Sequence, residues 1–350
     1  MIVNLQVLRT IAALLVFFHH LMPLIDRVFP GVRKYETGAS GVDIFFVLSG
    51  FIMVVTTYQK DADPVRFLTN RIVRVVPIYW IMTLVIVCIF LLGARPLGVM
   101  DLQPSYIWKS LFFIPFQRAG FWEPILSVGW TLNYEMFFYA VFSLLMIVRR
   151  FYLRIFFLVF SLFAFVAAGL FFHFNDYLEY YSSPVILDFA LGAAFGAFFC
   201  ARRGKPAALG PRAAWFLIAL GGLVIVATST GFNLYNNNIL RPMTWGVAGL
   251  LLVAGLVFLE QNGHVAKHWF LVLLGNASYS IYLVHNLMIQ ISMKAVGMTG
   301  IAGFPSLVLT SCLALGLTTL FGLASYRFIE APINQAYRKR DGVRRVSLQH

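Results

Sequence analysis

Charge is scarce in this sequence. Of its 350 residues only 12% are Asp, Glu, Lys or Arg, while 60% are hydrophobic. In a soluble domain about a quarter of the residues are charged. The apolar residues also come as long runs, and a run of about 20 crosses the hydrocarbon of a bilayer. This composition excludes an ordinary soluble domain and predicts a polytopic α-helical membrane protein.

Cysteines and metal-ligand patterns are nearly absent as well. The three cysteines, Cys88, Cys200 and Cys312, lie in apolar runs and lack CxxC or metal-ligand spacing. We interpret them as small buried hydrophobic side chains. Among the ionisable residues inside the apolar runs, no two His, Asp or Glu share the spacing of a known metal motif. The sequence therefore predicts no bound metal.

Negative charge is the third shortage. The chain has 27 Lys and Arg against 14 Asp and Glu, a formal net charge of +13. In a soluble protein this excess would suggest nucleic acid or an acidic partner. No aromatic–basic stripe or groove-reading motif accompanies it, and membrane proteins concentrate Lys and Arg in cytoplasmic loops. We therefore expect no nucleic-acid partner.

The apolar runs predict about ten membrane-spanning helices in an all-α bundle. The sixth run is short and contains Gly192 and Gly196, which suits close helix packing. The stretch 269–274 could lie at the interface or within the membrane, and so could the aromatic stretch 105–116. The expected spans are 4–25, 41–58, 75–93, 129–148, 151–173, 184–201, 213–231, 243–260, 275–294 and 303–327.

The basic residues predict the orientation. An even number of spans puts both termini on one side, and the linkers and tail on that side then hold 16 Lys and Arg, against 8 on the other. We therefore expect both termini in the cytoplasm. Residues 1–335 are predicted to form one membrane domain, and 336–350 a basic cytoplasmic tail that contacts anionic membrane lipids.

Ionisable residues inside the spans are costly in lipid, so each one is a candidate site residue. Arg9 and His20 are 11 residues apart on the first span. They share one helical face and are separated by about 16 Å along the axis. The alternative is an arginine that reaches the headgroups and a histidine bonded to a neighbouring helix.

Five ionisable residues from five different spans are expected at one depth, in the outer half of the membrane. A shared, wet pocket that opens outward would explain this. Its chemistry suits a histidine base oriented by a carboxylate, which makes a hydroxyl nucleophilic. The five are His20, Asp43, Glu135, Asp188 and His285.

Two further patterns are expected to bind ligands. Arg71 and Arg74, at i and i+3, form one cationic patch suited to phosphate, although they are also typical of ordinary cytoplasmic flanking charge. Ser278, Tyr282 and His285 fall on one helical face at i, i+4 and i+7. That face could be a packing stripe or could hydrogen-bond a sugar hydroxyl.

These residues lie in motifs that together resemble the acyltransferase-3 family of integral membrane O-acyltransferases. The resemblance runs from the first span to the last. Asn133 departs from the resemblance, because many relatives have serine there. Some relatives carry an attached hydrolase-like domain; this chain resembles the exopolysaccharide acetyltransferase branch, which has the membrane module alone. The motifs are Arg9 to His20, Gly41-Val-Asp-Ile-Phe-Phe-Val-Leu-Ser-Gly-Phe51, Arg71-Ile-Val-Arg74, Trp130 to Glu135 with Phe138-Tyr139, Asp188 to Gly192, Ser278 to His285, and Arg327-Phe-Ile-Glu330-Ala-Pro332.

The resemblance implies an enzyme of the bacterial inner membrane. It would move an acetyl group from cytoplasmic acetyl-CoA to a hydroxyl of an exopolysaccharide or its lipid-linked intermediate, without a metal. The family implies roles for each group of residues. Arg9, Arg71 and Arg74 would hold the CoA phosphates, and His20 would be the base, oriented by Asp43 or Glu135, or would briefly carry the acyl group. The substrate pocket would include Asn133, Asp188, Ser278, Tyr282 and His285.

Other functions compete with this one. A transporter or flippase of a polysaccharide precursor would also use buried ionisable residues. It predicts inverted repeats and paired broken helices, however, and the sequence indicates neither. Within the enzymes, the donor could be another thioester such as succinyl-CoA, and the acceptor a small lipid or an antibiotic.

Overall fold

The computed structural model describes most of the chain. The predicted basic tail, 336–350, lies almost wholly outside the described residues, as do the predicted span ends at 173 and 229–231. The described residues are 2–32, 36–59, 63–98, 101–118, 120–172, 174, 176–228, 239–337 and 339.

The described chain is almost entirely helical, which confirms the predicted all-α class. Its one hairpin pairs β1 (Gln117–Arg118) with β2 (Phe121–Trp122). The α-helices are α1 (Asn4–Val28), α2 (Ser40–Thr57), α3 (Pro64–Leu91), α4 (Pro104–Leu111), α5 (Trp130–Leu145), α6 (Phe151–Phe172), α7 (Asp176–Tyr181), α8 (Leu187–Ala201), α9 (Pro211–Ala227), α10 (Val247–Gln261), α11 (Trp269–Asn276), α12 (Ser278–Gly297) and α13 (Gly303–Ser325). Short 3₁₀ turns occur at Thr37–Ala39, Pro96–Gly98, Ser127–Gly129 and Pro184–Ile186, and π-helical turns at η7 (Pro242–Gly246) and η8 (Tyr326–Glu330).

Seven helical segments of the described chain are long and apolar enough to cross a membrane. An eighth arises if α11 and α12, which meet at a bend of 77°, form one broken span. With 16 and 17 residues, α5 and α9 are shorter than these seven segments, each of which has at least 18. The protein is therefore a multi-pass helical membrane protein, and a total of ten spans remains a prediction.

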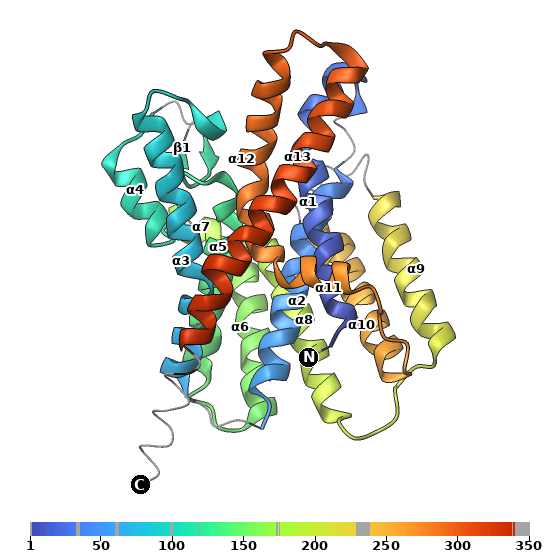
Figure 1. Cartoon of the computed structure of the whole chain (residues 1–350). Coiled ribbons are helices and arrows are strands. Elements are labelled where there is room, and N and C mark those ends of the chain that lie inside the picture. Colours follow the sequence, from blue (N-terminus) through green and yellow to red (C-terminus); the bar gives the residue numbers. More distant parts are fainter. Residues whose placement is uncertain are drawn as a thin grey trace.

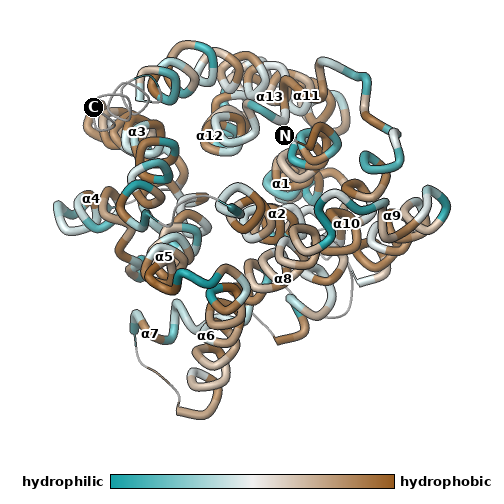
Figure 2. Tube along the Cα trace, turned by 90° about the horizontal axis from the view of Figure 1, so that it is seen from below, coloured by the Kyte–Doolittle hydropathy of each residue, from teal (hydrophilic) through white to brown (hydrophobic). Residues whose placement is uncertain are grey.

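The helices differ in how deeply they lie in the bundle. Seen along the bundle, α1, α2 and α12 lie inside a ring of other helices (Figure 2). The most apolar stretch of α2 is 78% buried, whereas that of α6 is only 22% buried and faces outward. Cys88 and Cys312 also lie on exposed helix faces, so the prediction that they are buried was wrong; only Cys200 is buried. An apolar residue in a span can face lipid instead of the protein core.

The bundle has two ends, which are visible in Figure 1. At the upper end α1 finishes and α2 begins, and at the lower end α3 begins. At the upper left side of the bundle, α4 and the hairpin form a small cap beside the top of α3 (Figure 1). In this cap burial raises the pKa of Glu123, and the guanidinium of Arg118, 3.8 Å away, opposes the shift.

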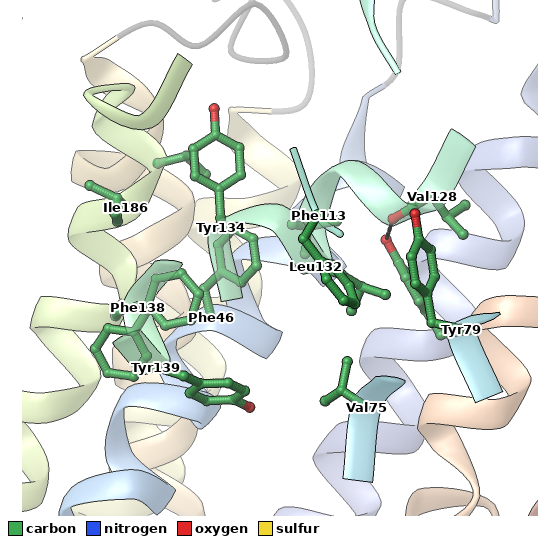
Figure 3. Close-up of a cluster of buried hydrophobic side chains, with 14 of the residues drawn as sticks. Phe46, Val75, Tyr79, Phe113, Val128, Leu132, Tyr134, Phe138, Tyr139 and Ile186 are labelled. Carbon is green, nitrogen blue, oxygen red and sulfur yellow. Dashed lines mark hydrogen bonds between the residues drawn. The ribbon is translucent and has the colours of Figure 1, made fainter. Parts of the chain in front are cut away.

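Glycines let α2 and α8 cross at close range, as the Gly-rich sixth run predicted. A Cβ added at Gly192 would overlap the carbonyl oxygen of Val47, and one at Gly50 would overlap that of Phe189. Beside this crossing, the ring of Phe189 stacks on Phe46 and Phe138, with centroids 4.4 and 4.5 Å away. Figure 3 shows the aromatic cluster that continues from there toward Tyr79. This contact fixes α2 next to α8.

The third span differs most from its predicted range. The helix begins at Pro64 and not at residue 75, because Asp63 caps it by accepting a hydrogen bond from the backbone N–H of Arg66 at 2.9 Å, and proline suits the first helical position. Arg71 and Arg74 are therefore held on a helix, and Arg74 lies about 15 Å above its start.

Candidate functional site

A cavity lies between α1, α2, α3, α5 and α12. It encloses about 740 Å³, its open mouth included. Five of the predicted site residues line it: Arg9, Arg74, Glu135, Ser278 and Tyr282. The remaining polar side chains in its wall are Ser49, Thr131, Tyr139 and Tyr279.

The lower part of the cavity is charged. Arg9 from α1 and Arg74 from α3 enter its wall together. Glu135 accepts hydrogen bonds from Ser49 Oγ at 2.8 Å and from the Tyr139 hydroxyl. Arg71 lies behind this wall, its guanidinium 5.6 Å from the ring of Phe67 and 6.0 Å from that of Tyr139. The structure therefore brings Arg9 and Arg74 into the cavity wall, and Arg71, which is not part of the wall, interacts with Tyr139, Arg74 and Glu135 from behind it.

A second carboxylate balances these arginines. Glu330, in the π-helical turn after α13, is 5% exposed and accepts a hydrogen bond from Ser280 Oγ at 2.7 Å. It interacts electrostatically with Arg74 and Arg9. The predicted cationic patch is thus a mixed cluster in which each arginine lies near a carboxylate.

Polar groups from α5 and α12 close the upper end of the cavity. The Tyr282 hydroxyl donates to the Val128 carbonyl at 3.0 Å and lies 2.9 Å from Thr131 Oγ1. One turn below, Ser278 lines the cavity, and its buried Oγ has no hydrogen-bond partner among the described residues. This hydroxyl is available to a ligand.

His20 and His285 form a hydrogen-bonded pair. His20 Nδ1 lies 3.2 Å from His285 Nε2 and 2.9 Å from the Val16 carbonyl, and His285 Nδ1 lies 2.6 Å from the Tyr282 carbonyl. Carbonyl oxygens only accept, so each Nδ1 carries the hydrogen in the neutral rings. His285 Nε2 then accepts from His20, and the lone pair of His20 lies on Nε2. The pair therefore presents His20 Nε2 as a proton acceptor.

Neither predicted carboxylate orients His20. Asp43 instead forms a buried ion pair with Arg241, whose Nε and Nη2 lie 2.8 and 3.0 Å from its two oxygens. Glu135 is occupied by Ser49 and Tyr139, as described above. Among the side chains of the described residues, the hydrogen-bond partner of His20 is His285, so a histidine–histidine pair stands where a histidine–carboxylate pair was expected.

Asp188 and Asn133 lie apart from the cavity. Asp188 is fully buried beside Asp43 and against Gly246, where an added Cβ would overlap its Oδ1. Asn133 is 2% exposed on α5, and its Oδ1 has no hydrogen-bond partner among the residues that the structure describes. The single pocket expected from depth is therefore divided into a cavity, a histidine pair and a buried acidic cluster.

Sequence reasoning missed Arg241 as a site residue. Arg241 is among the eight basic residues assigned to the outer loops, but it is 1% exposed and pairs with Asp43. Its position directly before Pro242 and an apolar run was a usable signal. Three further residues of the site belong to the motifs quoted above, but the sequence alone assigned them no role: Ser49, Tyr139 and Glu330. In the described residues no group of three or more His, Cys, Asp or Glu could hold a metal ion.

Comparison with known proteins gives the family. The sequence model of the acyltransferase-3 family, described as an acyltransferase domain, matches residues 2–327. The chain therefore belongs to this family of acyltransferases, as its motifs predicted. No solved structure matches the chain significantly.

Three curated proteins illustrate the relationship. The exopolysaccharide production protein ExoZ of Rhizobium meliloti (strain 1021) is 38% identical over 88% of this chain and 93% of its own length. Nodulation protein 10 of Rhizobium leguminosarum bv. viciae is 25% identical over 85% of both chains. The peptidoglycan O-acetyltransferase OatA of Listeria monocytogenes is 23% identical over 94% of this chain but 55% of its own length.

Proposed function

We propose that this protein is an O-acetyltransferase of the bacterial inner membrane. It moves an acetyl group from cytoplasmic acetyl-CoA to a hydroxyl of an exopolysaccharide or of its lipid-linked intermediate. The observation that carries the proposal is the His20–His285 pair, which leaves His20 Nε2 as a proton acceptor inside a membrane acyltransferase. The likeness to ExoZ, a protein named for exopolysaccharide production, supports the choice of acceptor.

In the proposed reaction His20 acts as the general base. The acceptor hydroxyl gives its proton to His20 Nε2 while its oxygen attacks the thioester carbonyl. The new oxygen–carbon bond forms, the carbon–sulfur bond breaks, and the proton passes to the CoA sulfur. Once protonated, His20 keeps two acceptors for its Nδ1–H, the Val16 carbonyl and His285 Nε2, which stabilise the imidazolium.

The cavity is the proposed donor site. Arg9 and Arg74 supply guanidiniums for the CoA phosphates, with Arg71 close behind. The unpartnered Ser278 Oγ, deeper in the cavity, suits a hydrogen bond to an amide of the pantetheine arm. Arg9 and His20 lie on one helix about 16 Å apart, a distance that an extended pantetheine arm covers. The donor would enter from the lower, cytoplasmic end and the acceptor from the upper end.

The test is O-acetylation of surface polysaccharide in a deletion strain. The strain is complemented with the wild type, His20→Ala, Arg74→Ala or His268→Ala, and ester-linked acetate is measured after mild alkaline release. We expect His20→Ala to lose acetylation by about 10²–10⁴-fold and Arg74→Ala to require more acetyl-CoA in membrane assays. His268 is an exposed histidine, so its alanine variant is the matched control and should keep full acetylation.

Three outcomes would count against the proposal. Full acetylation by the His20→Ala variant would show that His20 is not the general base. Loss of polysaccharide export with acetylation intact would favour a transporter. If membranes that contain the wild type transferred the acyl group of succinyl-CoA but not that of acetyl-CoA, the donor would be succinyl-CoA and not the proposed acetyl-CoA.

A further inference from the structure

Tyr282 stands between the cavity and the histidine pair. It lines the upper end of the cavity, whereas neither His20 nor His285 lies in the cavity wall within the described chain. Its ring centroid is 5.6 Å from that of His285, which in turn is 4.8 Å from that of His20. A group that travels up the cavity therefore meets Tyr282 before it meets the histidines.

The Tyr282 side chain is fixed at both ends. Its hydroxyl is bonded to the Val128 carbonyl and to Thr131, and its own backbone carbonyl is bonded to His285 Nδ1. The residue is 7% exposed, and its ring packs edge-on against Phe45, with centroids 6.1 Å apart. A ring held by hydrogen bonds at the para position and by packing on its face cannot move aside without losing these contacts. Its position is therefore a fixed boundary of the cavity.

We propose that Tyr282, supported by Thr131 and Phe45, limits the length of the acyl group that the enzyme transfers and restricts the donor to short acyl thioesters. This inference rests on the proposed function. If the CoA phosphates bind at Arg9 and Arg74, the acyl end of the donor lies at the upper end of the cavity, against the Tyr282 ring. A two-carbon group needs little space beside the ring, and each added methylene needs space that the ring already occupies. In fitted apolar pockets one methylene changes the specificity about 10–200-fold.

The experiment compares donors in membranes that contain the full chain. Acetyl-, propionyl-, butyryl- and hexanoyl-CoA are supplied with unacylated surface polysaccharide isolated from a deletion strain. The readouts are free CoA thiol and the acyl esters recovered from the polysaccharide. For Tyr282→Ala the kcat/KM ratio of hexanoyl- to acetyl-CoA should rise at least about tenfold over the wild type. Tyr282→Phe keeps the ring and its packing against Phe45 but loses the hydroxyl's bonds, so its ratio should stay much nearer to the wild-type value than that of Tyr282→Ala.

Two further variants provide a substitute for the alanine variant and a control. Tyr282→Leu removes the phenol with a smaller loss of volume, so it covers the case in which the alanine variant fails to fold, and its ratio should shift in the same direction. Tyr134→Ala is the matched control: Tyr134 is another buried tyrosine that donates to a backbone carbonyl, that of Tyr180 at 2.7 Å, and it does not line the cavity. Its ratio should not change, and a ratio does not depend on how much protein folds.

The outcomes separate this inference from the function on which it rests. If the wild type transfers acetyl but neither Tyr282→Ala nor Tyr282→Leu changes the ratio, Tyr282 does not set the acyl length. A similar shift in Tyr134→Ala would also overturn the role of Tyr282, because the altered ratio would then come from a general loss of packing in the protein. If the wild type consumes none of the four thioesters, the proposed function itself fails.

Discussion

The two ring nitrogens of His20 have different surroundings, and this difference decides which one can accept a proton in the proposed reaction. Nδ1 carries the hydrogen because the Val16 carbonyl accepts from it at 2.9 Å, and His285 Nε2, 3.2 Å away, is a second acceptor. In the proposed reaction Nε2 is therefore the base. His285 thus takes the position that a carboxylate has in many catalytic pairs, and it does so without adding a negative charge to the membrane interior.

His285 should therefore affect the turnover more than the binding of the donor. We expect His285→Ala to lower kcat about 10–100-fold, less than the loss of a general base itself, with little change in the KM for acetyl-CoA because His285 does not line the cavity. His285→Gln keeps an acceptor oxygen and should retain more activity. Steady-state kinetics in membranes measure both effects. Equal losses in the two variants would show that packing at this position matters and not its acceptor atom.

Arg241 holds a buried charge cluster together. Its guanidinium is 1% exposed and pairs with Asp43, and Asp188 lies beside them, both acids being fully buried. Removing one partner of a buried pair leaves the other charge unpaired, at a cost of about 3–5 kcal/mol. We expect Arg241→Met to lower the unfolding temperature in detergent strongly, and the double variant Asp43→Asn with Arg241→Met to recover part of the loss. A double variant less stable than Arg241→Met would contradict this pairing.

At the scale of elements, the crossing of α2 and α8 depends on the absence of side chains. Gly192 lies directly on the backbone of Val47, so a methyl group there must push the helices apart. Overpacking of this kind costs about 1–3 kcal/mol. We expect Gly192→Ala to lower the thermal stability, and also the activity because α2 carries Ser49 in the cavity wall. Gly222→Ala on α9 is the matched control, because nothing lies within 4 Å of its added Cβ; the two variants should differ in melting temperature.

The bend between α11 and α12 is the second element that shapes the site. α11 packs against α1, where Thr10 Oγ1 donates to the Leu271 carbonyl at 2.7 Å and Gly275 lies on the backbone of Gln6. After a turn of 77°, α12 begins at Ser278. Ser278 and Tyr282 can therefore face a cavity that also contains Arg9.

At the scale of the whole molecule, the Asp43–Arg241 ion pair constrains the topology. Asp43 stands at the upper start of α2, so Arg241, at the start of the η7–α10 segment, must be at the upper end too. The preceding α8 begins beside Asp43 and runs downward to Ala201. The chain can return upward only through α9, although this helix has only 17 residues. Added to the seven long segments and the bent α11–α12 pair, α9 makes nine candidate spans in the described chain, and α5 would be the tenth of the prediction.

Cysteine labelling tests this topology. In a background without Cys88, Cys200 and Cys312, single cysteines at Arg95, Lys205 or Lys294 are treated in intact cells with a membrane-impermeant maleimide. All three positions are exposed. We expect labelling at Arg95 and Lys294 and none at Lys205 until the cells are opened. Labelling of Lys205 from outside would invert the proposed orientation of the α8–α9 loop.

The sequence by itself determined the class of the protein and the identity of most candidate residues. Long apolar runs leave few alternatives to membrane helices, because a backbone in lipid must satisfy its own hydrogen bonds. Charged residues inside such runs are noticeable for the same physical reason, which is why Arg9, His20 and Glu135 were found. The order of their motifs then indicated the acyltransferase-3 family.

The tertiary structure alone decided which of these residues meet. Helical spacing places residues on the faces of one helix but says nothing about which face of another helix they contact. That choice depends on side-chain packing between segments far apart in sequence, such as the 265 residues that separate His20 from His285. Packing therefore pairs Asp43 with Arg241 and not with His20, and it places Tyr282 between the cavity and the histidine pair.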